Sequence, residues 1–426
     1  MTTTMTATTM TEGVEGVEAV EAVGSFESVE SVESVESIDS IGSIGSEGGV
    51  GSEGVTFDAI RTTAAEFGLT SSDLDALGAE FEAIRREVLS DLGQRDVDYI
   101  RRVIRAQRGL AAGGRALLFA GFFPPAWLAG TAALAVAKIL DNMEIGHNVM
   151  HGQYDWTRDP ALSSKQFDWD TACPGDQWRL SHNYEHHTFT NIVGKDRDVG
   201  YAILRISPDQ RWTPVALGNP LYAALLALMF EHGVMLHNVE AERLMSGDKS
   251  WSEAWPTLRG GLAKSARQAV KDYVLWPLAT GPMALSTMAG NATANVARNV
   301  WAFTIIFCGH FPAGTYEFSV EESEEESRGH WYFRQLLGSA NIEGGALFHL
   351  MSGNLSHQIE HHLFPDLPAH RYGELAPRVR AICEQYGLPY NSGGLSRQFG
   401  SVVAKICRMA LPGGRSWTAR AFPVAA

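Results

Sequence analysis

The chain has 426 residues, which is long enough for a large buried core, and its formal net charge is −15. An acidic chain lacks the basic footprint of a general nucleic-acid binder, so we exclude that class of function. The acidity is concentrated in the first 55 residues and in the run EESEEES at 321–327, which leaves the rest closer to neutral. The four cysteines show no pairing pattern and no CxxC motif, which favours reduced thiols in an intracellular setting.

Residues 1–55 form a low-complexity acidic tail with a repeat of about three residues, as in SVESVESVESIDS. With this period, neither a helix nor a strand would bring the valines onto one face. Large apolar side chains are also too few to offset the entropy lost on folding. The segment also lacks the basic start and the continuous apolar core of a secretory signal. We therefore expect residues 1–55 to be a disordered tail with no assigned function.

A helical pattern begins after Thr70, where Leu74, Leu77 and Phe81 recur at steps of three and four residues and TSSD supplies candidate N-caps. Several arginines follow between residues 85 and 108. Because basic residues favour the cytoplasmic side of a membrane, we expect residues 56–110 to form a cytoplasmic helical segment.

The next stretch, 116–140, is long and apolar with one charge, Lys138, and a membrane span needs roughly 20 such residues. Two interpretations compete. The stretch is either one long tilted helix or a hairpin that turns near Pro124, with a first leg that starts near Leu110 and contains Arg115. The hairpin is favoured, because an even number of crossings keeps both polar flanks on one side of the membrane.

Two further apolar stretches, 272–290 and 293–314, are separated by a few small residues and predict a second membrane hairpin. Between the two hairpins, residues 219–237 contain an apolar run that is too short to cross a bilayer comfortably. We expect that segment to be an interfacial or buried helix.

Histidines are unevenly distributed: eight of the 14 lie in three short stretches. These stretches are GHNVMH with His147 and His151, SHNYEHH with His182, His186 and His187, and HQIEHH with His357, His361 and His362. A single histidine is most often an ordinary polar or core residue, but that explanation does not suit three clusters in one chain. Histidines four residues apart lie on one face of a helix, about one turn apart, where they can bind a common metal.

The number and type of these ligands fit two metal ions bound mainly through nitrogen. A zinc site uses three or four ligands, so this set is large enough for two metals. Imidazole suits iron, copper or zinc, whereas magnesium and calcium prefer oxygen. Zinc has no redox chemistry and would indicate a membrane hydrolase instead. A pair of irons can activate dioxygen, which is what the removal of hydrogen from an unactivated methylene requires.

The order HxxxH, HxxxHH and QxxHH, with apolar hairpins between them, resembles the membrane fatty acyl desaturases. WRLSHNYEHHTFTNIVGKDRDVGY (178–201) and NLSHQIEHHLFPDLPAHRY (354–372) are similar to that family's second and third histidine boxes and their downstream residues. The resemblance covers roughly residues 110–385. Within the family, GHNVMHGQYDW and SHQIEHHLFPDLP are most similar to the actinobacterial acyl-CoA (stearoyl-CoA) Δ9 desaturases.

The resemblance implies a di-iron centre held almost entirely by histidines. Carried over position by position, its ligands would be His147, His151, His182, His186, His187, His361 and His362. A further family ligand lies late in the last membrane helix, where this chain has His310. The third box begins with Gln358 where many relatives have histidine, and His357 precedes it; either residue could complete the site, and the spacing favours Gln358.

Four other residues could orient ligand imidazoles from behind. Asp196 and Asp198 follow the second box, Glu360 lies within the third, and His237 lies on the short apolar helix. Solvated loop acids and a structural histidine are the alternative interpretations.

The implied activity is the insertion of a cis double bond, at Δ9, into a long-chain saturated acyl-CoA, with dioxygen as co-substrate. The chain contains no His-Pro-Gly-Gly haem signature, and no stretch of it offers a GxGxxG nucleotide fingerprint directly before a helix. Electrons would therefore come from NAD(P)H through a separate flavin or iron–sulfur reductase. Within the same chemical class, a fatty-acyl hydroxylase or a front-end (linoleoyl-type) desaturase remains an alternative. A zinc-dependent membrane hydrolase and a non-catalytic membrane protein are the alternatives from other classes.

The expected fold is an all-α integral membrane protein with about four transmembrane helices in two hairpins and a cytoplasmic helical cap that carries the metal site. The histidine boxes would face the cytoplasm from the cell membrane. Residues 111–385 would form the membrane desaturase domain and residues 386–426 a C-terminal cytoplasmic tail. Basic residues in that tail, such as Arg397, Lys405 and Arg408, could attract CoA phosphates, an acidic electron donor or anionic lipid.

Overall fold

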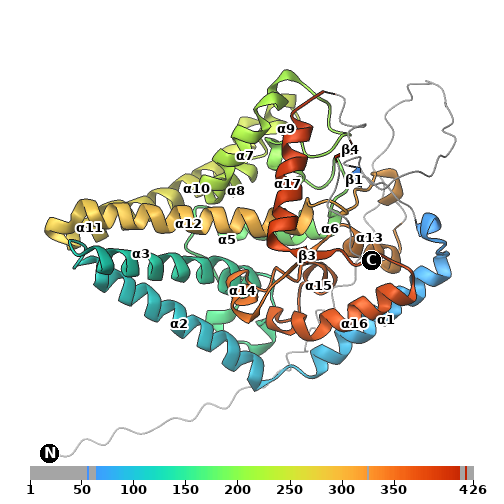
Figure 1. The fold of residues 1–426 in the computed structure, drawn as a ribbon, viewed down its shortest axis with the longest axis horizontal. Helices are drawn as coiled ribbons and strands as arrows, with labels where there is room; N and C mark the ends of the chain where they lie inside the picture. The colour runs from blue at the N-terminus through green and yellow to red at the C-terminus, as the bar shows by residue number, and fades with distance from the viewer. Residues whose placement is uncertain (1–54, 57–63, 324–325, 413–417, 420–426) are drawn as a thin grey trace, which may run out of the picture. The chain divides into compact units, whose positions relative to one another are not determined.

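The computed structural model describes residues 55–56, 64–323, 326–412 and 418–419, and this part of the chain is mostly helical (Figure 1). The expected disorder of the N-terminal tail up to residue 54 lies outside the described residues. The longer α-helices are α1 (Ser71–Ser90), α2 (Gln94–Leu118), α3 (Pro124–Ile139), α7 (Asn219–Leu228), α8 (Phe230–His237), α10 (Trp251–Val270), α12 (Ala284–His310), α13 (Arg328–Leu337), α16 (Tyr372–Gln385) and α17 (Leu395–Met409).

Shorter elements join these helices. The short α-helices are α4 (Asn148–Met150), α5 (Gly175–Trp178), α6 (His187–Phe189), α9 (Ala241–Ser246), α11 (Trp276–Ala279), α14 (Ala346–Met351) and α15 (Gln358–Leu363). Three π-helical segments span Leu140–His147, Arg179–His186 and Lys271–Leu275. Strand β2 (Asn341–Glu343) pairs in parallel with β3 (Ser392–Gly394), and β1 (Val55–Thr56) pairs antiparallel with β4 (Thr418–Ala419). The four cysteines carry free thiols, and Cys407 alone is exposed.

Helix α1 begins where the sequence predicts. The Thr70 side chain accepts a hydrogen bond from the Asp73 backbone N–H, while Asp73 accepts one from the Thr70 backbone, and together they form a capping box. The predicted apolar stripe is buried: Leu77 and Phe81 are fully enclosed. This stripe packs against α13 and α16, which in turn contact α15, and these helices share one apolar core close to the third histidine box.

The first apolar stretch folds as a hairpin. Helix α2 ends at Leu118, the chain turns over residues 119–123, and Pro124 occupies the first turn of α3, where its missing N–H is not needed. The interpretation as one long helix is therefore wrong. The first leg is longer than the leg predicted from Leu110, because α2 already begins at Gln94.

The second hairpin has a different turn from the one the sequence predicts. The expected turn between residues 290 and 293 is wrong: α12 runs unbroken through this stretch, and the chain reverses earlier, around Gly281, whose φ is +57°. The first leg is formed by α10, a π-helical segment and α11. The small residues that suggested a turn serve packing instead, since a Cβ at Gly290 would lie 2.9 Å from the Thr131 Oγ1 of α3.

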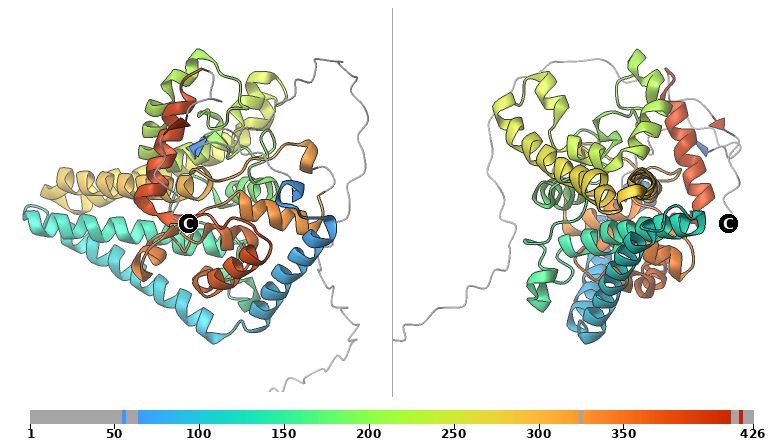
Figure 2. Two further views of the ribbon diagram at one scale, coloured as in Figure 1. Left: turned by 45° about the vertical axis from the view of Figure 1, so that its right-hand side comes forward. Right: turned by 90° about the vertical axis from the view of Figure 1, so that its left-hand side faces the viewer.

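The two hairpins run toward the same end of the described fold (Figure 1), and Figure 2 shows their helices from two further directions. A buried ionic cluster connects them. Arg115 of α2 and Lys138 of α3 each lie 2.8 Å from a carboxylate oxygen of Asp272, in the second hairpin. Arg115 also donates to the side-chain oxygen of Asn291, at 2.5 Å. Charges that are costly in an apolar segment are thereby neutralised by partners from other helices.

The short apolar segment 219–237 is a broken helix. Helices α7 and α8 meet at a bend of 103°. Leu221, Leu225 and Leu228 on α7 are exposed, whereas α8 packs against α10 and α12. Among the described residues, no single helix combines the length and the apolar composition of a membrane span, although residues 214–228 and 230–237 taken together satisfy both criteria.

Close packing of α2 on α3 predicts a sharp difference between two neighbouring glycines. A Cβ at Gly114 would lie 2.9 Å from the Gly130 backbone oxygen, whereas a Cβ at Gly113 meets no atom of the structure within 4 Å. Both substitutions by alanine gain similar helix propensity, about 0.5–1 kcal/mol. We expect Gly114→Ala to lower the free energy of unfolding by about 1–3 kcal/mol through overpacking. Gly113→Ala should leave it unchanged or raise it.

Thermal unfolding of the two purified variants, compared with the parent chain, measures this difference. Equal melting temperatures for Gly113→Ala and Gly114→Ala would contradict the close approach of α2 and α3.

Candidate metal centre

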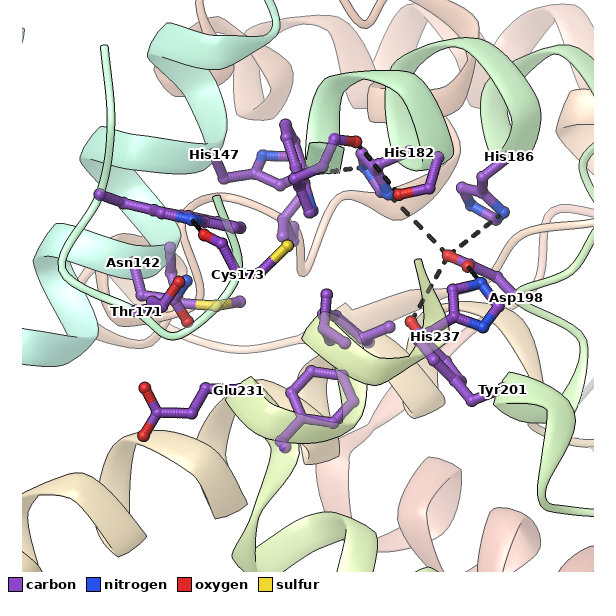
Figure 3. A pocket seen from close by; sticks show the side chains of 18 of the residues that line it. Asn142, His147, Thr171, Cys173, His182, His186, Asp198, Tyr201, Glu231 and His237 are labelled. Carbon is purple, nitrogen blue, oxygen red and sulfur yellow. Dashed lines mark hydrogen bonds and ion pairs between the residues drawn. The ribbon is translucent and has the colours of Figure 1, made fainter. Parts of the chain in front are cut away.

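Four separate segments bring the histidines of the sequence motifs together. His147 and His151 follow α3, and His182, His186 and His187 follow α5. His310 is the last residue of α12, and His361 and His362 lie on α15. The ring centroids of His147 and His361 are 4.8 Å apart, and those of His186 and His310 are 4.6 Å apart. Residues separated by more than 200 positions therefore share one site, part of which is drawn in Figure 3.

The second histidine box lies on a π-helical turn, and the first box begins where another π-helical segment ends. One π-helical segment ends at His147, and the other covers the second box up to His186. A π turn closes from residue i to i+5 and so contains more residues than an α turn. Residues four and five positions after His182 therefore both return close to it: the rings of His186 and His187 lie 5.2 and 4.9 Å from the His182 ring.

Ligand atoms converge in overlapping groups, within each of which the atoms lie within 4.8 Å of one another. The groups are His147, His151, His182 and His361; then His186, His310 and His362; then His187, His361 and His362; and His182, His186 and Asp198. The first two groups share no residue and include all four segments. The donor set has the size and the nitrogen chemistry expected for two metal ions.

Unpartnered nitrogens fit this interpretation. Among the described residues, no hydrogen-bond partner reaches the buried Nε2 atoms of His151, His186, His187, His361 and His362. A buried polar atom without a partner costs about 1–3 kcal/mol. Several such atoms facing one another are what a metal site requires, because each offers a free lone pair to a cation.

Several ring nitrogens on the opposite side have partners, whereas Nδ1 of His187 and of His310 has none among the described residues. Nδ1 of His147 lies 3.1 Å from the Asn148 side-chain oxygen, and Nδ1 of His362 lies 2.9 Å from the side-chain oxygen of Gln335. Such contacts fix the tautomer and the ring orientation, so that Nε2 faces the site. The sequence offered no signal for Gln335, because that residue comes from α13, outside every motif.

Burial favours the neutral form of an imidazole, which is the form that binds metal. It lowers the pKa of His147 to about 3. Together with the neighbouring histidines, burial also holds the pKa values of His151, His187, His361 and His362 well below the usual range.

Asp196 and Asp198 lie behind the second box, on the side away from the converging Nε2 atoms. An Asp196 oxygen lies 3.1 Å from the Nδ1 atom of His186 and also accepts the Asn191 backbone N–H at 2.8 Å. Burial alone would lower the pKa of His186, but the charge and hydrogen bond of Asp196 raise it overall. Asp198 lies 3.1 Å from Nε2 of His237, which places both residues at the edge of the site (Figure 3).

Glu360 faces a different part of the fold. Its carboxylate accepts hydrogen bonds from the Tyr390 hydroxyl at 2.7 Å and from the Asn341 side chain at 2.9 Å. Burial raises the pKa of Glu360 to about 7. Its nearest histidine contact is His357, at 3.9 Å, so Glu360 braces the start of α15 from the side of β2.

The two candidates of the third box point in different directions. The Gln358 side-chain nitrogen lies 3.0 Å from Nε2 of His310, and its buried oxygen makes no hydrogen bond to any described residue. The His357 ring instead stacks on His349, with centroids 4.5 Å apart. Gln358 therefore faces the converging histidines, and His357 does not.

A cavity begins at the histidines and continues between α8 and the residues before α5. Its walls are largely apolar and include Trp178, Phe230, Val234 and Ile306. Asn142, Thr171 and Glu231 lie at the end away from Asp198 (Figure 3). An apolar cavity with a few polar groups is typical of a small-molecule site, and here it adjoins the candidate ligands directly.

One basic residue of the C-terminal region is not free for a partner. Lys405 is buried and lies 3.1 Å from a carboxylate oxygen of Glu317.

Comparison with known proteins agrees with this site. The family model described as fatty acid desaturase matches residues 122–394. The chain is 46% identical over 348 residues to an NADPH-dependent stearoyl-CoA 9-desaturase of Mycobacterium tuberculosis, covering 81% of this chain and 82% of that protein. It is 26% identical over 287 residues to an sn-1 linoleoyl-lipid 6-desaturase of Synechocystis, covering 64% and 77% respectively. It is also 32% identical over 252 residues to fatty acid desaturase 3 of Bos taurus, covering 56% and 51%.

The matched region contains all three histidine boxes and the end of α12, which are the four segments that meet in the structure. The chain therefore belongs to the fatty acid desaturase family.

Proposed function

We propose that this protein inserts a cis double bond at Δ9 into long-chain saturated acyl-CoA. The observation that carries the proposal is the convergence of unpartnered imidazole nitrogens at the head of a largely apolar cavity. The 46% identity to a protein named as a stearoyl-CoA 9-desaturase supports the choice of substrate and of double-bond position. The 6-desaturase relative is less similar and acts, by its name, on a lipid-bound chain.

The proposed cofactor is a pair of iron ions. Its ligands would be His147, His151, His182, His186, His187, His310, Gln358, His361 and His362. The buried donors without protein partners fit such a pair. When bound, the irons supply the activation of dioxygen that removal of hydrogen from an unactivated methylene requires. Electrons would come from NAD(P)H through a separate flavin or iron–sulfur reductase.

The residues of the chain itself provide orientation and exclude water. Trp178 and Phe230 hold the acyl chain along the cavity, so that a fixed pair of carbons faces the histidines. The polar partners behind the imidazoles, such as Gln335 and Asp196, keep Nε2 of each ring directed at the metals. The result is a rigid site. Which carbons of the acyl chain react there depends on where the acyl chain is held, and not on differences in reactivity between its carbons.

We further propose that the two hairpins lie in the cell membrane as four spans, with the histidines on the cytoplasmic side. The exposed leucines of α7 support an additional apolar contact with the bilayer surface. Residues 1–55 would be an acidic tail, 56–110 a cytoplasmic segment, 111–385 the desaturase domain and 386–426 a cytoplasmic tail.

The activity is tested in a host that lacks its own desaturase and expresses this chain with a suitable reductase. Gas chromatography of the fatty acids should show a monounsaturated product with the double bond at carbon 9. Replacing His186 by alanine should abolish the product, because His186 belongs to one of the converging groups. His330→Ala, on α13 outside the site, serves as the control and should retain the product. A hydroxylated chain, or a double bond at another position, would contradict the proposal.

The two candidates of the third box give a separate prediction. Gln358→Ala should lower the metal bound per chain, because the Gln358 side chain faces His310. His357→Ala should leave the metal content unchanged, because that ring stacks on His349. Elemental analysis of the purified variants measures both. Equal loss in the two variants would contradict the assignment of Gln358, and about one zinc with no iron in the parent chain would reject the di-iron proposal.

Metal removal should also destabilise the fold. An ion that binds the native chain alone stabilises it, and its loss leaves the facing imidazole nitrogens without partners. We expect a chelator to lower the melting temperature and renewed addition of Fe²⁺ to restore it. An unchanged melting temperature in a chain that has demonstrably lost its metal would contradict this expectation.

A further inference from the structure

One face of α8 forms a wall of the cavity. Phe230, Glu231, Val234 and His237 all line it, at the spacing of one helical face. His237 ends the helix, and its side chain is 2% exposed. Neither ring nitrogen makes a hydrogen bond to a described residue, although Nε2 lies 3.1 Å from a carboxylate oxygen of Asp198. A buried histidine at the wall of a site, whose only close polar neighbour among the described residues is a carboxylate, calls for a specific role.

Asp198 connects His237 to the second histidine box. One Asp198 oxygen lies 3.1 Å from Nε2 of His237. The other lies 4.0 Å from Nδ1 of His182 and 3.8 Å from Nδ1 of His186. The Tyr201 hydroxyl is a further contact of the same carboxylate, at 3.5 Å. Figure 3 shows these contacts meeting at Asp198.

The loop that carries Asp198 is attached to α8 a second time. The Arg197 side chain donates to the backbone oxygen of His237 at 2.6 Å. The Asp198 backbone N–H donates to Asp196 at 3.0 Å, so the two acids are held in one arrangement. Asp196 already contacts His186 closely, which leaves His182 as the ring that depends on Asp198.

We propose that His237 is a positioning residue, which holds Asp198 behind His182 and so fixes the orientation of that ring toward the metals. The inference rests on the proposed metal centre. At 4.0 Å from His182, Asp198 is too far for a hydrogen bond of ordinary length, so its attraction for the ring depends on where the carboxylate is held. The contact with His237 supplies that constraint from the opposite side. Partners of this kind, behind the ligands, typically change metal affinity by about 10–100-fold.

Two substitutions separate positioning from packing. His237→Phe keeps a ring of similar size but removes both nitrogens, whereas His237→Gln keeps an N–H group able to reach Asp198. We expect His237→Phe to weaken the binding of Fe²⁺ and Co²⁺ by about 10–100-fold. We expect His237→Gln to restore binding to within a few-fold of the parent chain. His330→Phe, outside the site, is the control and should bind as the parent chain does.

The measurements are made on the full purified chain without substrate or reductase. Competition with a chelator gives the metal affinities, and the visible absorption of bound Co²⁺ reports the geometry of its ligands. The Co²⁺ spectrum of His237→Phe should change, and that of His237→Gln should resemble the parent spectrum. Parent-like affinity and spectrum in His237→Phe would overturn the proposal. Equal loss in His237→Gln and His237→Phe would overturn it as well, since packing would then explain the effect.

A second variant covers the case in which His237→Phe fails to fold. Asp198→Asn should weaken metal binding similarly, and, where both variants fold, combining the two substitutions should add little because they break one connection. Parent-like binding in Asp198→Asn would overturn the proposal. If the His237 substitutions change metal binding as expected but the parent chain forms no unsaturated product, the proposed function fails and the positioning role stands.

Discussion

The structure depends on a set of buried imidazole nitrogens that have no hydrogen-bond partner among the described residues. Each would weaken the fold if left alone, yet the chain brings them together from four segments at one place. The opposite nitrogens of several rings contact polar groups such as Asn148 and Gln335, so these rings cannot turn away to relieve the cost. The fold therefore holds a set of nitrogen donors that the described side chains do not satisfy and that could bind metal ions.

Local patterns in the sequence predicted much of the fold. Short stretches of sequence reveal the capping residues and apolar stripe of α1, the proline at the turn of the first hairpin and the histidine boxes. The structure confirms the helix and the hairpin, and it brings the boxes together. The second turn was misplaced because Gly290 and its small neighbours are typical both of turns and of tightly packed helices. Only the contact with Thr131 on α3, far away in sequence, distinguishes the two.

The polar partners behind the candidate ligands were predictable where they lie next to a motif. Asp196 and Asp198 follow the second box, and both lie against it in the structure. Glu360 lies inside a box but faces Tyr390, because successive residues of a helix point in different directions. Gln335 comes from another helix altogether. Nor does apolar patterning reveal that Arg115 is compensated by Asp272, a pairing that reconciles a charged residue with the hairpin.

The π-helical winding before the first box and through the second box sets the direction in which both boxes face. An α-helix advances about 100° per residue, so removing a single residue from a π turn would restore ordinary winding and rotate one flank relative to the other by about that angle. His147 or His186 would then no longer face the other histidines. The site therefore requires a fixed number of residues between the start of each helix and its histidine box, just as it requires the histidines themselves. A search that scores the spacing within the boxes alone would accept chains whose rings never meet.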